Sequence, residues 1–332
     1  MNSYIFSFKT FLFSLILIAI YEFTINIFFE KPSVYDSNFF EKHIIRPDSR
    51  ASFVIATKMY QALNEDYQYI QIGGSGGLHG VNPTIVSKDY YNASCCRIAT
   101  LEGYGVIGKN IIKELNKKYG VKDRNLVYVL SPLSFPHQQS MFSNHLSKTL
   151  SENFVSQKGL AINSLPSQNL RPPFKFNGLP YESIKLDKTM TLKNMDSAVK
   201  IYTASLDNNG YIPFYNKIEI EYPPENYFEE ALLEKGNFID WVKEISWIGK
   251  NNNYRFFIAI LPLPFELDKK DMEAIQDIVF EMKKIDNVKV VDEFIEDKSF
   301  HDQMLWSDNV HMNPAGSTLF SKRLAISIKS IK

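Results

Sequence analysis

The sequence predicts an α/β protein in which helices cover both faces of a mostly parallel sheet. Four short apolar runs, rich in β-branched and aromatic residues, read as buried strands. They are residues 67–73, 126–131, 255–261 and 288–292. Segments with helical periodicity separate them, and this alternation implies right-handed crossovers and a doubly wound layer fold.

The helices are predicted from apolar spacing and from their end signals. Residues 106–120 form an amphipathic pattern that ends on a glycine suited to a C-cap. Apolar residues recur at helical spacing over 238–248 and again over 268–285. The last helix is the best marked, because Asn313 suits its N-cap and Pro314 its first helical position.

The N-terminus predicts a membrane anchor. An apolar run at 11–29 follows Lys9 and is long enough to cross a hydrocarbon core of about 30 Å. No small-residue cleavage site follows, so residues 1–31 are interpreted as a cytoplasmic start and an uncleaved transmembrane helix. Lys9 favours a cytoplasmic N-terminus and an extracytoplasmic body. Glu22 interrupts the run and either reaches the outer interface or contacts a multi-pass membrane protein.

The remaining chain is predicted to contain a stalk with a connecting helix at 32–62 and one domain at 63–332. Turn-rich residues at about 132–224 form an insertion in that domain. Lys+Arg and Asp+Glu both number 37, and no basic block occurs, which excludes a nucleic-acid partner. The adjacent Cys95 and Cys96 lack metal-ligand spacing, so no metal or cofactor is expected.

Ser75 is the first candidate for chemistry. It lies in "YIQIGGSGGLHG", directly after a predicted strand, with two glycines on each side. Glycines remove side chains around the hydroxyl, and N–H groups such as that of Gly76 are candidates to hold a developing oxyanion. Taken alone, this stretch is better explained as a plain glycine–serine turn, because such turns are common.

Asp308 and His311 strengthen the interpretation. They lie three residues apart in "SDNVHMNPAG", just before the capped last helix. A histidine can accept the serine proton, and a carboxylate can fix the tautomer and orientation of that histidine. Ser75 after a first strand, with this pair before a last helix, predicts a nucleophile, a base and its orienting acid.

These two blocks resemble the first and last blocks of the SGNH (GDSL-type) hydrolases, especially their membrane-anchored extracytoplasmic branch. That branch includes alginate O-acetyltransferases and the D-alanyl transfer protein of teichoic acid synthesis. The resemblance spans about residue 67 to the C-terminus and implies a three-layer α/β/α, flavodoxin-like fold. It implies Ser75 as nucleophile, His311 as base and Asp308 as its orienting acid.

The middle of the chain departs from the SGNH pattern. The family's second block supplies a glycine N–H to the oxyanion hole, whereas the corresponding neighbourhood here contains Asn92, Ser94 and Cys95. These three are therefore candidate oxyanion or substrate residues. The third block supplies an asparagine, which is missing here. Its possible substitutes are Ser131, Ser134 and His137.

Three further residues have two readings each. His79 either faces the site or packs the helix, and Trp306 either stacks on a sugar or belongs to the core. Arg97 is a surface arginine or a contact for an anionic substrate. His301 is assigned no role.

A serine, histidine and aspartate set implies acyl transfer through an ester on Ser75. The anchor favours an O-acyltransferase, with O-acetyl transfer to a cell-envelope or secreted polysaccharide, because tethering raises the effective concentration beside a membrane partner. The expected partners are a polysaccharide acceptor, an acyl donor and a multi-pass membrane-bound O-acyltransferase. The expected location is the cytoplasmic membrane, with the domain in the periplasm or at the cell surface. The alternatives are a carbohydrate esterase, or a non-catalytic scaffold or polysaccharide-binding protein.

Overall fold

A computed structural model describes most of the C-terminal domain and a short N-terminal helix. The described residues are 8–17, 19–20, 58, 61–63, 65–94, 101–136, 208–215, 217, 219–224 and 226–330. Most of the predicted stalk and most of the predicted insertion lie outside these residues. The fold below is therefore that of the domain from residue 65 onward.

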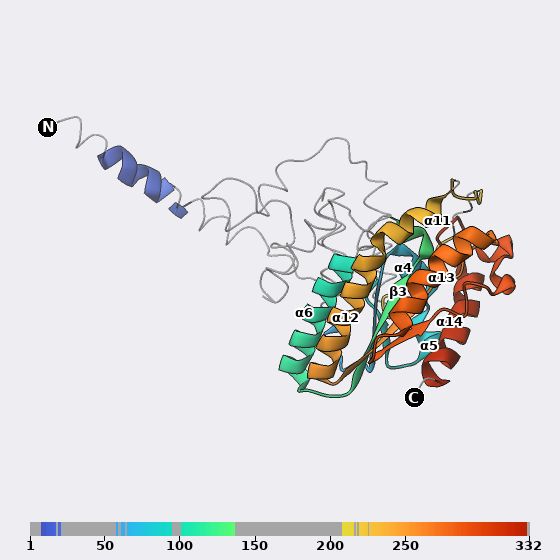
Figure 1. Ribbon diagram of the computed structural model, residues 1–332. Coiled ribbons are helices and arrows are strands. Elements are labelled where there is room, and N and C mark those ends of the chain that lie inside the picture. The colour runs from blue at the N-terminus through green and yellow to red at the C-terminus, as the bar shows by residue number, and fades with distance from the viewer. Residues whose placement is uncertain are drawn as a thin grey trace.

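The domain is built on one five-stranded parallel sheet (Figure 1). Its spatial order, β2-β1-β3-β4-β5, is the doubly wound order of flavodoxin-like folds. The strands are β1 (Tyr69–Gly73), β2 (Tyr90–Asn92), β3 (Arg124–Leu130), β4 (Tyr254–Ile260) and β5 (Val288–Val291). The prediction of a mostly parallel α/β sheet is confirmed. The edge strand β2 was not predicted, because three residues are too few to show a period.

Helices cover both faces of the sheet, with α6, α12 and α13 on one face and α5 and α14 on the other (Figure 1). The α-helices are α4 (Ser75–Gly80), α5 (Pro83–Val86), α6 (Leu101–Tyr119), α11 (Tyr227–Glu230), α12 (Lys235–Asn252), α13 (Lys269–Lys283) and α14 (Pro314–Ser330). Short 3-10 helices are η1 (Pro132–Ser134), η4 (Ala231–Glu234), η5 (Lys298–Phe300) and η6 (Gln303–Leu305). The expected helix ends are present: Gly120 follows α6 with a φ of 76°, and the side chain of Asn313 accepts from the N–H groups of Ala315 and Gly316.

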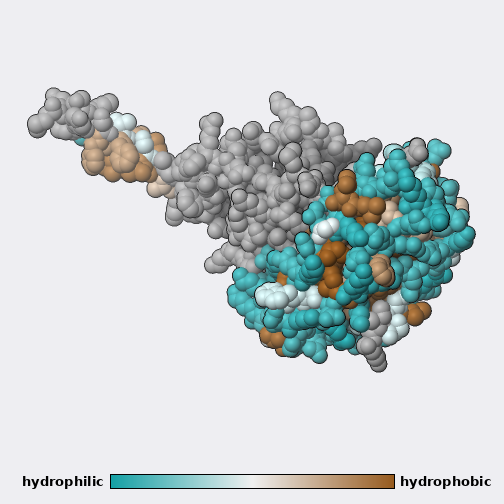
Figure 2. All heavy atoms as spheres, in the orientation of Figure 1, coloured by the Kyte–Doolittle hydropathy of each residue, from teal (hydrophilic) through white to brown (hydrophobic). Residues whose placement is uncertain are grey.

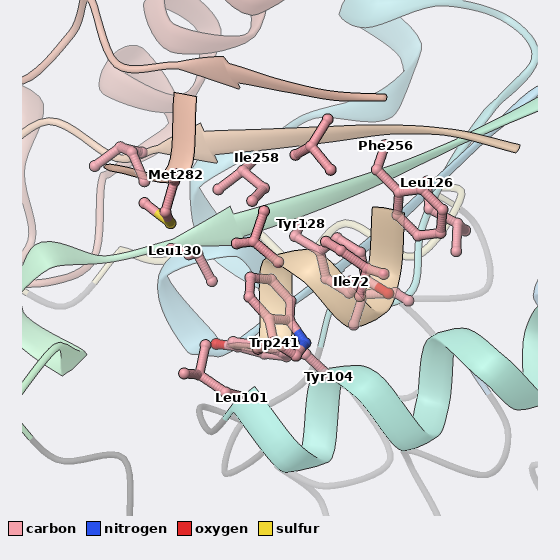
Figure 3. Packing of buried hydrophobic residues seen from close by; sticks show 14 of the residues in the cluster. Ile72, Leu101, Tyr104, Leu126, Tyr128, Leu130, Trp241, Phe256, Ile258 and Met282 are labelled. Atoms are coloured by element: carbon pink, nitrogen blue, oxygen red, sulfur yellow. The ribbon is translucent and has the colours of Figure 1, made fainter. Parts of the chain in front are cut away.

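The larger core lies between the sheet and helices α6, α12 and α13. Figure 3 shows Tyr104 of α6 and Trp241 of α12 packed beneath Tyr128 of β3. The Tyr128 ring meets Trp241 edge-on with centroids 5.0 Å apart, and it stacks on Phe256 of β4 at 5.8 Å. Such aromatic pairs add to the burial of apolar area that stabilises this layer.

The smaller core lies on the opposite face of the same strands. Val127 and Val129 of β3 belong to it, whereas Tyr128 between them belongs to the larger core. Phe320 and Leu324 of α14 cover these valines. Since successive strand residues face opposite sides and both sides are buried, the central strands read as continuous apolar runs.

A buried arginine joins the start of the domain to the amino ends of the central strands. Arg124, which is only 2% exposed, donates from Nε and Nη2 to Asp66 Oδ1 at 3.1 and 2.7 Å. Its Nη1 donates to the carbonyl of Gly120 at 3.2 Å. This edge of the sheet is closed by charge pairing, opposite the edge at which the strands end.

The predicted anchor is described only in part. Residues 8–17 and 19–20 are helical, and large apolar side chains along them, such as Phe11 and Phe13, are exposed. The rest of the apolar run, including Glu22, lies outside the described residues. Among the helices that are described, none combines the length and the apolar character needed to span a membrane.

The visible surface of the domain is mainly hydrophilic, with one group of apolar side chains beside α12 and α13 (Figure 2). Exposed apolar residues on these elements and on the adjoining η4 include Leu233, Trp247 and Phe280. This face of the domain is thus mainly hydrophilic, with its apolar side chains grouped locally.

Candidate functional site

Ser75 lies where the order of the sheet reverses. The chain passes from β1 outward to β2 and then returns to β3 on the other side of β1, so the switch point lies between β1 and β3. Ligands of open α/β sheets bind at such points, beyond the carboxyl ends of the strands. Ser75 follows β1 after a single residue and is the first residue of α4.

A small pocket opens beside Ser75. Its volume is about 120 Å³, and it lies between the turn after β1 and the segment after β3. The lining side chains are largely apolar or absent: Gly74, Ser75, Gly76, Gly77, Tyr104, Val129, Ser131, Leu133, Ser134, Leu261 and Val310. Ser131 and Ser134, proposed as substitutes for the missing asparagine, are therefore part of this wall.

Asp308 and His311 are hydrogen-bonded to each other. Nδ1 of His311 donates to Asp308 Oδ2 at 2.7 Å. The second oxygen, Oδ1, accepts from the backbone N–H groups of Val310 and His311 at 2.8 and 2.7 Å. Because a carboxylate only accepts, the Nδ1 atom of His311 carries the hydrogen, and its Nε2 atom is the acceptor nitrogen of the neutral ring.

The loop that carries this pair is closed by its neighbours. Trp306 and Met312 form an antiparallel bridge, and the N–H of Ser307 donates to the carbonyl of His311 at 2.8 Å. Burial alone raises the pKa of Asp308, but the hydrogen bonds from His311 and Val310 outweigh it and hold that pKa below its ordinary value. The carboxylate therefore stays ionised beside the imidazole.

The fold brings the loop against the turn that carries Ser75. A Cβ atom built on Gly76 would lie 3.5 Å from Cγ1 of Val310 and 3.6 Å from its carbonyl oxygen. His79, four residues after Ser75 on α4, has its ring centroid 5.1 Å from that of His311, at an interplanar angle of 87°. The two distant blocks of sequence thus form one site.

Ser75 and His311 lie on adjoining segments, and no hydrogen bond joins them. Nε2 of His311 is buried and has no hydrogen-bond partner. Ser75 remains partly exposed. In proteins without a bound substrate, catalytic hydrogen bonds are often long and tighten only in the complex. Of the two expected hydrogen bonds, the one between Asp308 and His311 is formed and the one between Ser75 and His311 is not.

Asn92 and Ser94 lie beneath α4 and do not line the pocket. Both are fully buried. The Asn92 amide donates to the carbonyls of Gly77 and Val81 at 3.0 and 2.9 Å, and its Oδ1 accepts from the N–H of Ser94. Gln71 donates to the Ser94 hydroxyl at 2.6 Å. In this arrangement their polar groups hold α4 on the sheet, so the expectation that they face the reacting atoms needs correction.

Gly76 does lie at the pocket, as does Tyr104 behind it. Tyr104 is fully buried, and burial raises the pKa of its phenol despite a hydrogen bond with the backbone of Gly74. Tyr104 stays protonated and supports the residue that precedes Ser75. Cys95 lies outside the described residues, as do Cys96, Arg97 and His137.

A segment from the predicted insertion completes the wall around His311. We call residues 208–215 the strap. The carbonyl of Ile212 accepts from Nδ1 of His79 at 2.7 Å, and the Phe214 ring lies 4.8 Å from His79 and 4.9 Å from His311. The Ser307 hydroxyl donates to the carbonyl of Phe214 at 3.0 Å. In the sequence, these residues were marked only by the turn-rich stretch "LDNNGYIPF". A turn pattern does not predict which residues the segment contacts.

Trp306 and His301 do not line the pocket. Trp306 is 3% exposed and donates from Nε1 to the carbonyl of Phe300 at 2.7 Å, which confirms the core-packing reading. His301 lies near Glu266 and Lys298, outside the site. Within the part of the chain that the structure describes, no group of His, Cys, Asp and Glu is arranged to hold a metal ion.

Comparison of the chain with models of protein families, with curated proteins and with solved structures gave no match.

Proposed function

We propose that the protein is an extracytoplasmic serine-dependent O-acyltransferase of the SGNH type, which transfers a short acyl group, in the first place acetyl, to a polysaccharide. The observation that carries this proposal is the Asp308–His311 hydrogen bond beside Ser75 at the switch point. A histidine with its hydrogen fixed on Nδ1 offers a lone pair on Nε2, which is what a general base needs.

In the proposed reaction the Ser75 hydroxyl oxygen attacks the carbonyl carbon of an acyl donor. Its proton passes to Nε2 of His311, and the positive charge is stabilised by Asp308. The tetrahedral intermediate expels the donor's alcohol or thiol, which takes that proton, and an ester remains on Ser75. A sugar hydroxyl then attacks this ester and gives its proton to His311. The second tetrahedral intermediate breaks the bond to Ser75, whose oxygen takes that proton from His311, and the O-acyl sugar leaves.

The oxyanion of the intermediate is proposed to bind the first turn of α4. The N–H groups that open a helix have no intrahelical acceptor, and Gly76 and Gly77 present theirs without side chains. Asn92 and Ser94 then act indirectly, since their hydrogen bonds fix this helix on the sheet. This replaces the glycine and asparagine donors of the SGNH pattern.

A transferase is favoured over an esterase by the N-terminus. The exposed apolar side chains at 8–17 and 19–20, with the apolar sequence that continues to residue 29, support a membrane anchor. An anchor places the domain beside a multi-pass membrane-bound O-acyltransferase that delivers the acyl group. An esterase gains nothing from that tether.

Substitution Ser75→Ala tests the function directly. We expect polymer-bound acetate, released by mild base from the cell envelope, to fall to background in cells that carry the variant. The matched control is Ser299→Ala, since Ser299 is exposed and does not line the pocket, and it is expected to retain full acylation. Unchanged acylation in a folded Ser75→Ala variant would refute the proposal.

The purified full-length protein in detergent separates transfer from hydrolysis. With p-nitrophenyl acetate as donor, a transferase should release p-nitrophenol faster when a sugar acceptor is added, and acetylated sugar should appear by mass spectrometry. Rapid hydrolysis that ignores the acceptor indicates the esterase. Failure of a fluorophosphonate to label Ser75 indicates the non-catalytic scaffold.

A further inference from the structure

Two aromatic rings that the proposed reaction does not use flank His311, whose side chain is 20% exposed. His79 comes from α4 and Phe214 from the strap, and both ring centroids lie within 5.1 Å of the centroid of His311. The rings of His79 and Phe214 also contact each other, with centroids 4.8 Å apart. Three rings from three separate segments therefore form one closed cluster.

His79 is itself fixed in this cluster. It is 7% exposed, and its Nδ1 atom faces the carbonyl of Ile212 at 2.7 Å. A carbonyl only accepts, so Nδ1 of His79 carries a hydrogen. Desolvation lowers the pKa of His79 to about 4, despite the Ile212 hydrogen bond, and His79 is accordingly neutral at physiological pH. His79 therefore adds no positive charge of its own beside His311.

The strap is held on the domain at several points that do not involve His311. The N–H of Asn92 donates to the carbonyl of Asn209 at 2.9 Å, and Lys58 donates to the carbonyl of Gly210 at 2.7 Å. Ser307 holds the carbonyl of Phe214. Phe214 is therefore attached both to the sheet edge and to the loop that carries His311.

We propose that His79 and Phe214 are positioning residues, which hold the plane of the His311 imidazole and keep water from it. The buried Nε2 of His311, which has no hydrogen-bond partner, is then reserved for a proton that comes from Ser75 or from a sugar hydroxyl. Only this last assignment rests on the proposed function. The enclosure of the ring can be measured without any substrate.

The primary test is the exchange with water of the Nδ1 hydrogen of His311, observed by NMR in the full-length protein with ¹⁵N-labelled histidine. The signal is assigned by its loss in His311→Gln. We expect exchange to be at least about tenfold faster in His79→Ala and in Phe214→Ala, because each opens one wall of the cluster. His79→Phe keeps a ring in place and should remain within about threefold of the wild type.

Phe238→Leu is the matched control. Phe238 is fully buried in the larger core, where it packs on Phe135. It lies on α12, outside the three segments that form the ring cluster, so its replacement lowers stability without opening the cluster. Its His311 signal should exchange at the wild-type rate. Wild-type exchange in folded His79→Ala and Phe214→Ala overturns the proposal, as does acceleration in Phe238→Leu equal to theirs, which would indicate general loosening.

A kinetic measurement separates this inference from the proposed function. With p-nitrophenyl acetate we expect His79→Ala to lower kcat by about tenfold with little change in KM, since a misplaced base slows the chemical step rather than binding. If the wild type itself does not turn over the ester, the proposed function fails while the exchange measurement still decides whether the ring is enclosed. A fall in kcat that His79→Phe does not restore contradicts positioning by the ring.

Discussion

At the scale of single residues, two acceptor groups determine which ring nitrogen of each histidine in the site carries hydrogen. Asp308 and the Ile212 carbonyl only accept, so His311 and His79 both carry hydrogen on Nδ1. Asp308 and His311 were predicted from their spacing and their position before a capped helix. His79 had two readings, and only its contact with the Phe214 ring, supplied from 135 residues further along the chain, shows how it is used.

The low pKa of His79 predicts how stability depends on pH. An unfolded histidine titrates near 6.5 and the folded one near 4, so the unfolded chain binds the extra proton between these values. Stability is unaffected by His79 above about pH 6.5 and falls by about 1.4 kcal/mol per pH unit towards pH 4. The charged or titratable groups that act on His79 are His311, Lys58 and Asp308.

The measurement is urea unfolding of the full-length protein at pH 7 and pH 5, compared with His79→Phe. The variant has no proton to gain at this position, so it should lose less stability than the wild type as the pH falls. Parallel losses in the two proteins would show that His79 is not the titrating group.

At the scale of elements, a six-residue helix carries Ser75, and such a helix has little stability of its own. The fully buried Asn92 at the end of β2 stabilises this helix, because its amide donates to the carbonyls of Gly77 and Val81. The sequence marked Asn92 as a candidate oxyanion residue. The hydrogen-bond partners of Asn92 depend on β2 lying beside β1. That strand has only three residues, which are too few to show the alternation that predicts a strand.

Substitution Asn92→Ala is expected to lower the free energy of unfolding by about 3 kcal/mol, since the buried carbonyl of Val81 loses its Asn92 donor and the N–H groups of Gln71 Nε2 and Ser94 lose the Asn92 Oδ1 acceptor. Asn82→Ala is the matched control. Asn82 caps α5, where its side chain accepts from the N–H of Thr84, and the loss of such a cap costs about 1 kcal/mol. Chemical denaturation of both variants checks the difference, and equal losses would refute the supporting role of Asn92.

At the scale of the whole molecule, the two ends of the sheet have different tasks. The carboxyl ends carry Ser75 and the pocket, while the amino ends are closed by Arg124 and Asp66. Hydrogen bonding to Lys122 lowers the pKa of Asp66 despite some burial, with Arg124 adding to the effect, so this carboxylate is ionised at neutral pH. Its contribution to stability is complete above the pKa of the unfolded carboxyl and is lost as pH falls through the lower folded value.

Asp66→Asn leaves the buried Arg124 without its counter-charge. Because the Asp66 side chain is 35% exposed, water replaces part of the loss, and we expect a decrease in unfolding free energy of about 2 kcal/mol. In the exposed Lys235–Asp277 pair, Asp277→Asn should cost at most about 0.5 kcal/mol. Denaturation measures both, and labelling of Ser75 by a fluorophosphonate should be unaffected in either variant. Impaired labelling in Asp66→Asn would contradict the separation of the two ends.

The sequence by itself determined the parallel α/β architecture, four of the five strands and the Asp308–His311 pair. These follow from local signals, since burial on both faces, helical period and caps are all read within about 20 residues. The tertiary structure determined which distant segments of the chain contact one another. The strap beside His311, the partners of Asn92 and the missing hydrogen bond between Ser75 and His311 depend on segments that are far apart in the chain. Contacts between these segments form only when the sheet brings them to one edge.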